Sequence, residues 1–125
     1  GALRLLFIFS GPGRSAGSVV SEPGSGVDVA PTLALGLGIE IPAYAEGQSL
    51  MPALCGTGPL SRPWVAVQNT TFGTDAIIEE RWKLVRRAAT EELYDLALDP
   101  SESNPLPAVG PDYDRLAAIA GAVYP

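Results

Sequence analysis

The chain has 125 residues, a length that favours one domain with a modest core. Its formal net charge is −6 and only 8 residues are basic, which argues against nucleic acid as a partner. A hydrophobic fraction of 46% is too high for a disordered chain, and no apolar run approaches the roughly 18 residues that span a bilayer.

Two residue types limit the chemistry that this chain can perform. Histidine is absent, so any site built within the chain lacks the commonest general base and the commonest metal ligand. Cys55 is the single cysteine, which rules out an intrachain disulfide. The chain begins with Gly1 rather than Met, and we expect it to be a processed or excised piece.

The first apolar run, Leu3–Phe9, is interrupted only by Arg4 and ends at a turn rich in glycine and proline, Ser10–Gly13. Its length and its flanking residues predict a strand that is buried on both faces, as in a doubly wound sheet. The turn lacks the G-K-[ST] ending of a phosphate-binding loop and no G-x-G-x-x-G follows it, so a plain turn is predicted.

The next element is a predicted helix that begins at Asp28, has Pro31 in its first turn and ends near Gly38. Aspartate is a good N-cap because its side chain accepts a hydrogen bond from an otherwise unpaired backbone amide. A metal-ligand role is the alternative for Asp28, and the capping role is favoured because the residue lies where a cap belongs. In the loop-rich stretch that follows, Ser49 is predicted to cap a further helical turn.

Four extended segments are predicted in the second half of the chain from their apolar alternation and flanking turn residues. They are Arg62–Val67, Ala76–Ile78, Trp82–Val85 and residues 91–96. The last of them stops at a turn that Asp99 and Pro100 nucleate. A final helix opens at Pro111, and its apolar residues recur at helical spacing, which gives it one face to pack on the sheet.

Basic residues concentrate between positions 81 and 87, where Arg81, Lys83, Arg86 and Arg87 make up half of the chain's lysines and arginines. One interpretation is an anion-binding patch. The other is the solvated face of a strand, favoured because surface charges of mixed sign mostly solvate. The answering carboxylates would be Glu79, Glu80, Glu91 and Glu92. A glycosylation sequon at 69–71 is interpreted as a coincidence because nothing in the sequence indicates secretion.

Five short motifs, taken in order, resemble the C-terminal part of the sulfatases, a branch of the alkaline-phosphatase superfamily. They are D-x-A-P-T-L at 28–33, G-x-S-L-x-P-x-L at 47–54, R-W-K-L at 81–84, E-L-Y-D-L at 92–96 and D-P-x-E at 99–102. The family also has a strand that ends in a Gly-Pro-Gly turn, which matches the first apolar run.

The resemblance implies an α+β fold that is part of a larger α/β sulfatase fold. We expect a small antiparallel sheet of about four strands packed by a C-terminal helix, preceded by a strand and a helix of the main sheet. Residues 1–60 would belong to the edge of the main α/β domain, and residues 61–125 would form the C-terminal subdomain.

The resemblance also implies a function, that of a structural and non-catalytic portion of a sulfuric ester hydrolase. The family uses a divalent cation, usually calcium, and a formylglycine made within a C-x-P-x-R-type motif. Cys55 is followed by Gly-Thr-Gly-Pro and does not match that motif, so it is rejected as the nucleophile. We therefore predict no catalytic, cofactor-binding or metal-ligand residue in this chain.

Two alternatives remain open from the sequence. The chain could be a free-standing binding or assembly module, or the C-terminal part of a phosphonate or phosphodiester hydrolase of the same superfamily. The expected partner is the upstream catalytic domain of a longer protein, with no nucleic acid and no membrane. The isolated chain is expected to form homo-oligomers, because Leu3–Phe9 would be an unpaired apolar strand.

Overall fold

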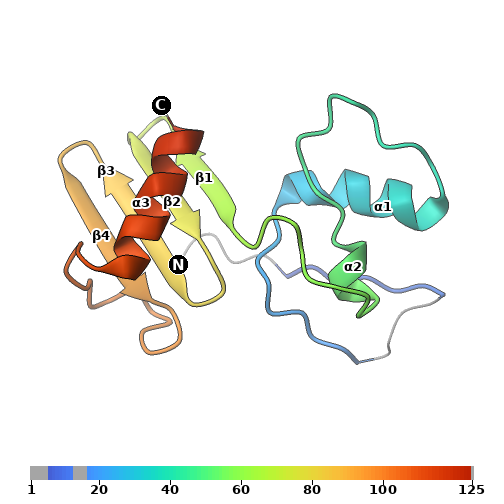
Figure 1. Ribbon diagram of the computed structural model, residues 1–125, viewed down its shortest axis with the longest axis horizontal. Helices are drawn as coiled ribbons and strands as arrows, with labels where there is room; N and C mark the ends of the chain where they lie inside the picture. Colours follow the sequence, from blue (N-terminus) through green and yellow to red (C-terminus); the bar gives the residue numbers. More distant parts are fainter. Residues whose placement is uncertain (1–5, 13–16, 125) are drawn as a thin grey trace. The chain divides into compact units, whose positions relative to one another are not determined.

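The computed structural model describes residues 6–12 and 17–124. Backbone contacts divide the chain into two compact units, the residues up to 63 and those from 64 onward (Figure 1). None of the described helices is both long and apolar enough to cross a membrane.

The unit from residue 64 onward contains a four-stranded antiparallel sheet whose strands follow one another in chain order (Figure 1). The strands are β1 (Val65–Asn69), β2 (Thr74–Ile78), β3 (Trp82–Arg87) and β4 (Thr90–Asp95). Short turns suffice because antiparallel neighbours need no crossover. Gly73, at φ 54°, takes the left-handed conformation that the β1–β2 turn requires. The predicted sheet of about four strands is confirmed.

Helix α3 (Pro111–Val123) covers one face of this sheet, and the predicted C-terminal helix is thereby confirmed (Figure 1). Its buried residues, Leu116 and Ala120, meet one inward-facing side chain from each of three strands. These are Ile77, Leu84 and Leu93, which the register places in one row across the sheet. Seven half-buried side chains surround this core: Trp64, Ala66, Trp82, Tyr113, Ala117, Ile119 and Tyr124.

The opposite face of the sheet carries a second, smaller cluster. Since successive side chains of a strand point to opposite faces, Val85 lies on the other side from Leu84. Val85 packs there with Ala76 and Tyr94, and all three are less than a tenth exposed. Lys83 shares this face and is only 7% exposed, so the face holds a buried charge beside apolar side chains.

The unit up to residue 63 contains the helical elements η1 (Gly26–Asp28), α1 (Val29–Leu37) and α2 (Met51–Leu54). The predicted end of the first helix is confirmed, because Gly38 follows α1 at φ 68° and satisfies the last carbonyls of the helix. The predicted cap of α2 is one position off, because the N-cap is Leu50; Ser49 lies just before it, and its Oγ accepts a hydrogen bond from the Met51 amide at 3.2 Å.

The first apolar run differs from its prediction. Residues 3–5 lie outside the described part of the chain, while residues 6–9 form neither helix nor strand. Leu6 and Ile8 are 84% and 80% exposed. A strand needs neighbours for its backbone N–H and C=O groups, and no described segment pairs with this one. The prediction of a buried strand is therefore wrong for Leu6–Phe9.

Candidate functional site

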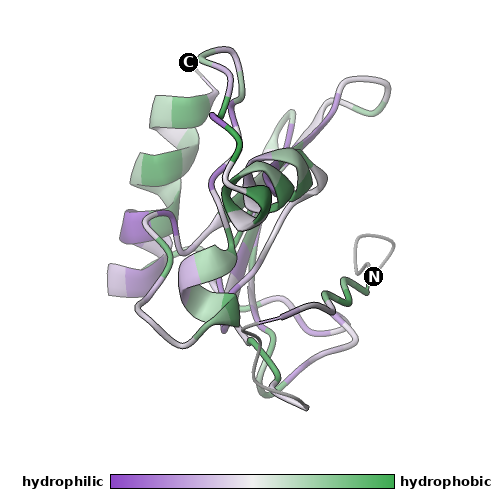
Figure 2. Cartoon of the chain, turned by 90° about the vertical axis from the view of Figure 1, so that its right-hand side faces the viewer, coloured by the Kyte–Doolittle hydropathy of each residue, from purple (hydrophilic) through white to green (hydrophobic). Residues whose placement is uncertain are grey.

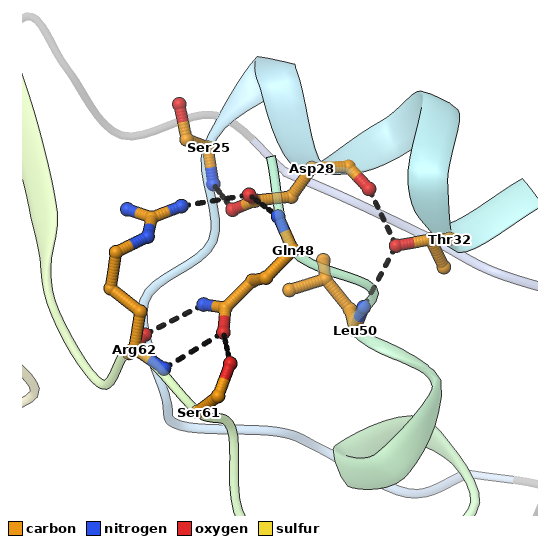
Figure 3. A network of polar contacts seen from close by, with 7 residues as sticks. All are labelled: Ser25, Asp28, Thr32, Gln48, Leu50, Ser61 and Arg62. Carbon is orange, nitrogen blue, oxygen red and sulfur yellow. Dashed lines mark hydrogen bonds and ion pairs between the residues drawn. The ribbon is translucent and has the colours of Figure 1, made fainter. Parts of the chain in front are cut away.

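A network of polar contacts is centred on Asp28, whose side chain is completely buried (Figure 3). Its Oδ1 accepts hydrogen bonds from the Gln48 amide at 2.9 Å and from Nη2 of Arg62 at 2.8 Å. Its Oδ2 accepts a hydrogen bond from the Ser25 amide at 2.8 Å. A buried carboxylate is tolerated only when it is paired and hydrogen-bonded, and these three donors meet that requirement.

Gln48 extends the network to the segment that precedes the sheet (Figure 3). Its side-chain nitrogen donates to the carbonyl of Arg62 at 2.6 Å, while its side-chain oxygen accepts from the Arg62 amide at 2.8 Å. The Ser61 hydroxyl donates to the same oxygen at 3.0 Å. The amide side chain thus pairs with both backbone groups of Arg62, as a neighbouring strand would.

Thr32 links helix α1 to the segment that leads into α2 (Figure 3). Its hydroxyl donates to the Asp28 carbonyl at 2.5 Å and accepts from the Leu50 amide at 2.8 Å. The same two segments touch at Gly47, where an added Cβ would lie 2.0 Å from the Val27 carbonyl oxygen. The Asp28 network, made of Ser25, Asp28, Thr32, Gln48, Leu50, Ser61 and Arg62, therefore joins the D-x-A-P-T-L and G-x-S-L segments.

The structure corrects the predicted role of Asp28. The residue precedes α1 as expected, but its side chain makes no capping hydrogen bond to that helix. It reaches back to Ser25 and across the unit to Gln48 and Arg62 instead. Both carboxylate oxygens are occupied by nitrogen donors, and among the described residues no three His, Cys, Asp or Glu side chains gather as metal ligands do. The geometry of Asp28 is that of a structural anchor.

The basic segment at 81–87, which comprises β3 and the residue before it, is neutralised residue by residue. Each of its four cations pairs with a carboxylate: Arg81 with Asp95, Lys83 with Glu102, Arg86 with Glu91 and Arg87 with Glu92. Glu91 and Glu92 were expected to answer these charges, whereas Asp95 and Glu102 were not. Glu79 pairs instead with Arg115 of α3 at 2.7 Å. The interpretation as a solvated strand face holds for the three arginines but is wrong for Lys83, which is only 7% exposed. The anion-binding alternative is left without an unpaired cation among these four residues.

Asp95 is a second buried carboxylate, and it accepts hydrogen bonds from the backbone that follows β4. Its Oδ2 accepts hydrogen bonds from Nε and Nη2 of Arg81 at 3.1 and 2.7 Å, and its Oδ1 accepts from the amides of Ala97 and Leu98. The Arg81 hydrogen bond is the main cause that holds the pKa of Asp95 below its usual range. Arg81 also stacks over the Trp82 ring, 4.9 Å from its centroid.

Two tyrosine hydroxyls complete the polar contacts of β4, one on each face of the sheet. Tyr94 donates to Glu92 at 2.9 Å, which is the main cause that lowers the pKa of Glu92. Tyr113 of α3 donates to Glu91, and this hydrogen bond raises the pKa of the Tyr113 hydroxyl. Helix α3 is thus fastened to the sheet by a polar contact as well as by its apolar face.

The predicted turn after β4 is confirmed and is built around Asp99. Its Oδ2 accepts hydrogen bonds from the amides of Ser103 and Asn104 at 2.8 and 2.7 Å. The backbone hydrogen bond from Asn104 is the main cause that lowers the pKa of Asp99. Cys55 lies at the end of α2 and is half-buried. In each motif, the polar side chains make contacts that hold the fold.

The structural comparisons identify what this scaffold resembles. No protein-family model and no curated protein matches the sequence. A 2-O GAG sulfatase structure is 30% identical, covers 93% of this chain and 27% of that chain, and has a TM-score of 0.65. A Bacteroides thetaiotaomicron protein assigned as a sulfatase is 32% identical over 77% of this chain and 22% of its own, with a TM-score of 0.55. The phosphonate monoester hydrolase of Agrobacterium radiobacter is 28% identical over 77% and 23%, with a TM-score of 0.50.

The fold is that of one portion of a group of hydrolases that includes sulfatases and a phosphonate monoester hydrolase. Within this group, the resemblance to a portion of a sulfatase that the sequence motifs predicted is confirmed. The chain spans about a quarter of the length of these relatives.

Proposed function

We propose that this chain is the C-terminal structural portion of a sulfatase-like sulfuric ester hydrolase and carries no catalytic group of its own. The observation that carries the proposal is that the charged side chains of the sequence motifs make structural contacts. Asp28, Lys83 and Asp95 are charged residues of these motifs, and each is buried and engaged in contacts that join segments of the scaffold.

The cation and the formylglycine that the resemblance implies would be held by residues outside this sequence. A cation site needs several oxygen or nitrogen ligands that point to one place. The described residues bring no three His, Cys, Asp or Glu side chains together, and Cys55 lacks the surrounding motif. The donor set does not fit these groups, and no catalytic step is assigned to the chain.

One specific observation favours a second candidate within the same group. The structural relatives include a phosphonate monoester hydrolase, which aligns with 77% of this chain. On this proposal the nucleophile lies outside this chain, so the scaffold is compatible with a parent enzyme that hydrolyses either sulfate esters or phosphonate monoesters. The sulfate ester is preferred because the 2-O GAG sulfatase aligns with 93% of this chain at a TM-score of 0.65, against 77% and 0.50 for the phosphonate monoester hydrolase.

The first experiment asks how long the native polypeptide is. An antibody raised against this chain should detect, in an extract of the source organism, a polypeptide three to four times its mass, since 93% of this chain aligns with 27% of the relative. A native polypeptide no longer than this chain would refute the proposal and favour the free-standing module.

The second experiment asks whether the chain is catalytic. The purified chain should hydrolyse neither aryl sulfates nor aryl phosphonate monoesters in the presence of calcium or manganese. Turnover that persists through repurification and disappears when a residue of this chain is substituted would show that a catalytic group is present.

A further inference from the structure

The four-stranded sheet has one closed edge and one open edge. Its strands follow the order β1–β2–β3–β4, so β1 and β4 are the edge strands. Beside β4, Leu106 forms an isolated bridge with Leu93, and the Leu106 amide donates to the Leu93 carbonyl at 2.8 Å. Beside β1, no segment of the described residues forms a bridge or a further strand. Backbone N–H and C=O groups on the outer side of β1 therefore lack a strand partner in this part of the chain.

The faces of the sheet, unlike this edge, are already occupied. Helix α3 covers one face, and Figure 2 shows its colouring change from hydrophilic near its start to hydrophobic further along. The opposite face holds the buried side chains of Ala76, Val85 and Tyr94. A strand that is added at β1 would leave both clusters in place, because an added strand pairs through backbone groups.

Strand β1 carries none of the features that block an edge. Natural edge strands are blocked by charged side chains, by proline or by a β-bulge. The sequence of β1 is Val-Ala-Val-Gln-Asn, without charge and without proline. Its register against β2 runs without interruption from the Val65–Ile78 pair to the Asn69–Thr74 pair, so the strand contains no bulge. The outer side of β1 is therefore suited to accept a further strand.

The strand that fits this edge best is a second copy of β1. In an antiparallel pair about a two-fold axis at Val67, Val67 lies opposite its own counterpart and Ala66 lies opposite Gln68. Val65 and Asn69 complete the register. Like charges that face each other across a pair are destabilising, and none would meet here because the strand is uncharged. One register therefore satisfies both copies at once.

The surroundings of β1 limit such an assembly to two copies. Pro63, two positions before the strand, has no N–H to donate, and the turn at 70–73 ends the strand on the other side. Once two β1 strands pair, the outermost strand on each side is β4, whose Leu93 carbonyl is already bonded to the Leu106 amide. A two-fold arrangement of this kind is closed and does not propagate into fibres.

We infer that two copies of this chain associate through their β1 edges and join their sheets into one continuous antiparallel sheet. The homo-oligomer that the sequence predicts would then form at β1 and not at the apolar run Leu3–Phe9. This pairing does not depend on the proposed function, because it uses only the sheet unit of this chain.

Light scattering of the full chain across a concentration series measures the association. The average mass should rise from 13.0 kDa at high dilution towards twice that value. Val67→Lys and Val67→Glu should each lower the association constant by about tenfold or more, because like charges would then face each other across the axis. An equimolar mixture of the two variants should restore the association, since a lysine then faces a glutamate.

Two further substitutions serve as controls for added charge elsewhere. Phe72→Lys, in the turn after β1, and Ile8→Lys, in the first apolar run, change residues that are 78% and 80% exposed. Both variants should associate as the unsubstituted chain does. Circular dichroism and tryptophan emission at high dilution check that every variant keeps its fold.

A thiol at the same position gives a second readout without added charge. In a Cys55→Ser background, Val67→Cys places two thiols opposite each other, and a short bismaleimide should link two copies at this position. Leu98→Cys, at a residue that is 81% exposed, is the matched control and should yield little linked product. This pair of variants decides the question if the charged variants at position 67 do not fold.

Three outcomes would overturn the inference. The first is a mass that stays at 13.0 kDa at every concentration. The second is an association that Ile8→Lys abolishes and Val67→Lys leaves intact, which would assign it to the first apolar run. The third is a mixture of folded Val67→Lys and Val67→Glu that associates no better than either variant alone, which would exclude a two-fold axis at Val67.

Discussion

The Lys83 ammonium lies 2.5 Å from a Glu102 carboxylate oxygen, and both side chains are largely buried. This pair joins β3 to the turn after β4 across 19 positions of sequence. Glu102 has a φ of 57°, a conformation that residues with a side chain adopt only occasionally. The lysine of R-W-K-L and the glutamate of D-P-x-E are therefore two ends of one contact, which explains their joint presence in this chain.

Substituting only one member of this pair should be costly. Lys83→Met is expected to lower the free energy of unfolding by about 3 kcal/mol, because it leaves the Glu102 carboxylate buried without its partner. The double variant Lys83→Met/Glu102→Gln should recover most of the loss, since no unpaired charge remains. Urea unfolding followed by circular dichroism measures both. The control is Arg87→Met, which removes a more exposed pair with Glu92 and should cost less than about 1 kcal/mol. Equal losses in the single and double Lys83 variants would contradict this account.

Asp28→Asn should loosen the unit up to residue 63 selectively. The asparagine places an NH₂ group where a carboxylate oxygen now accepts hydrogen bonds. At least one of the N–H groups of Ser25, Gln48 and Arg62 that donate to Asp28 therefore loses its acceptor. Amide exchange should accelerate at Gln48 and Leu50 and stay unchanged in the strands of the sheet. Asp112→Asn, which removes a carboxylate at the exposed start of α3, serves as the control. Unaltered exchange at Gln48 would mean that the network does not hold this unit.

Gly47→Ala should be far more damaging than an alanine at an open glycine. The added Cβ would lie 2.0 Å from the Val27 carbonyl oxygen, so one of two backbone segments must move. We expect a loss of at least about 2 kcal/mol, the range for overpacking in a well-packed region. Gly58→Ala is the matched control, because nothing lies within 4 Å of its Cβ position. Protease resistance of the segment from 25 to 62 reports the difference, and equal resistance in the two variants would rule out the close approach.

Stability towards acid should depend on Asp95. Its pKa is lower in the folded chain than in the unfolded chain, mainly through the Arg81 hydrogen bond. The ionised group therefore stabilises the fold above the ordinary aspartate range, and this contribution is lost as the pH falls through the folded-state pKa. Asp95→Asn should flatten the acid side of a plot of unfolding free energy against pH, and Arg81→Gln should do so in part. If the acid side keeps its slope in Asp95→Asn, other carboxylates control it.

The sheet and α3 could be predicted because their signals are local. Apolar residues alternate along Trp82–Val85 and recur at helical spacing after Pro111, because one face of each element packs on a core. The strand and the helix that share this core both belong to this chain. The turn at Asp99 was predictable for the same reason, since its hydrogen bonds reach only five residues.

The Asp28 network could not be predicted from local pattern. Its contacts join Asp28 to Gln48 and Arg62, which lie 20 and 34 positions away, and a residue at a capping position gives no sign of such partners. The prediction for the apolar run Leu3–Phe9 failed for a different reason. Its composition indicates burial in a sheet, but the neighbouring strands that burial requires are not among the described residues.

Both tryptophans, Trp64 and Trp82, pack around the core that α3 covers. Indole emission therefore carries a signal from the sheet unit alone and none from the unit that holds Asp28. Far-ultraviolet dichroism, in contrast, reports helices from both units. One unlabelled sample titrated with denaturant thus yields two curves, and their separation or coincidence tells whether the two units unfold independently or together.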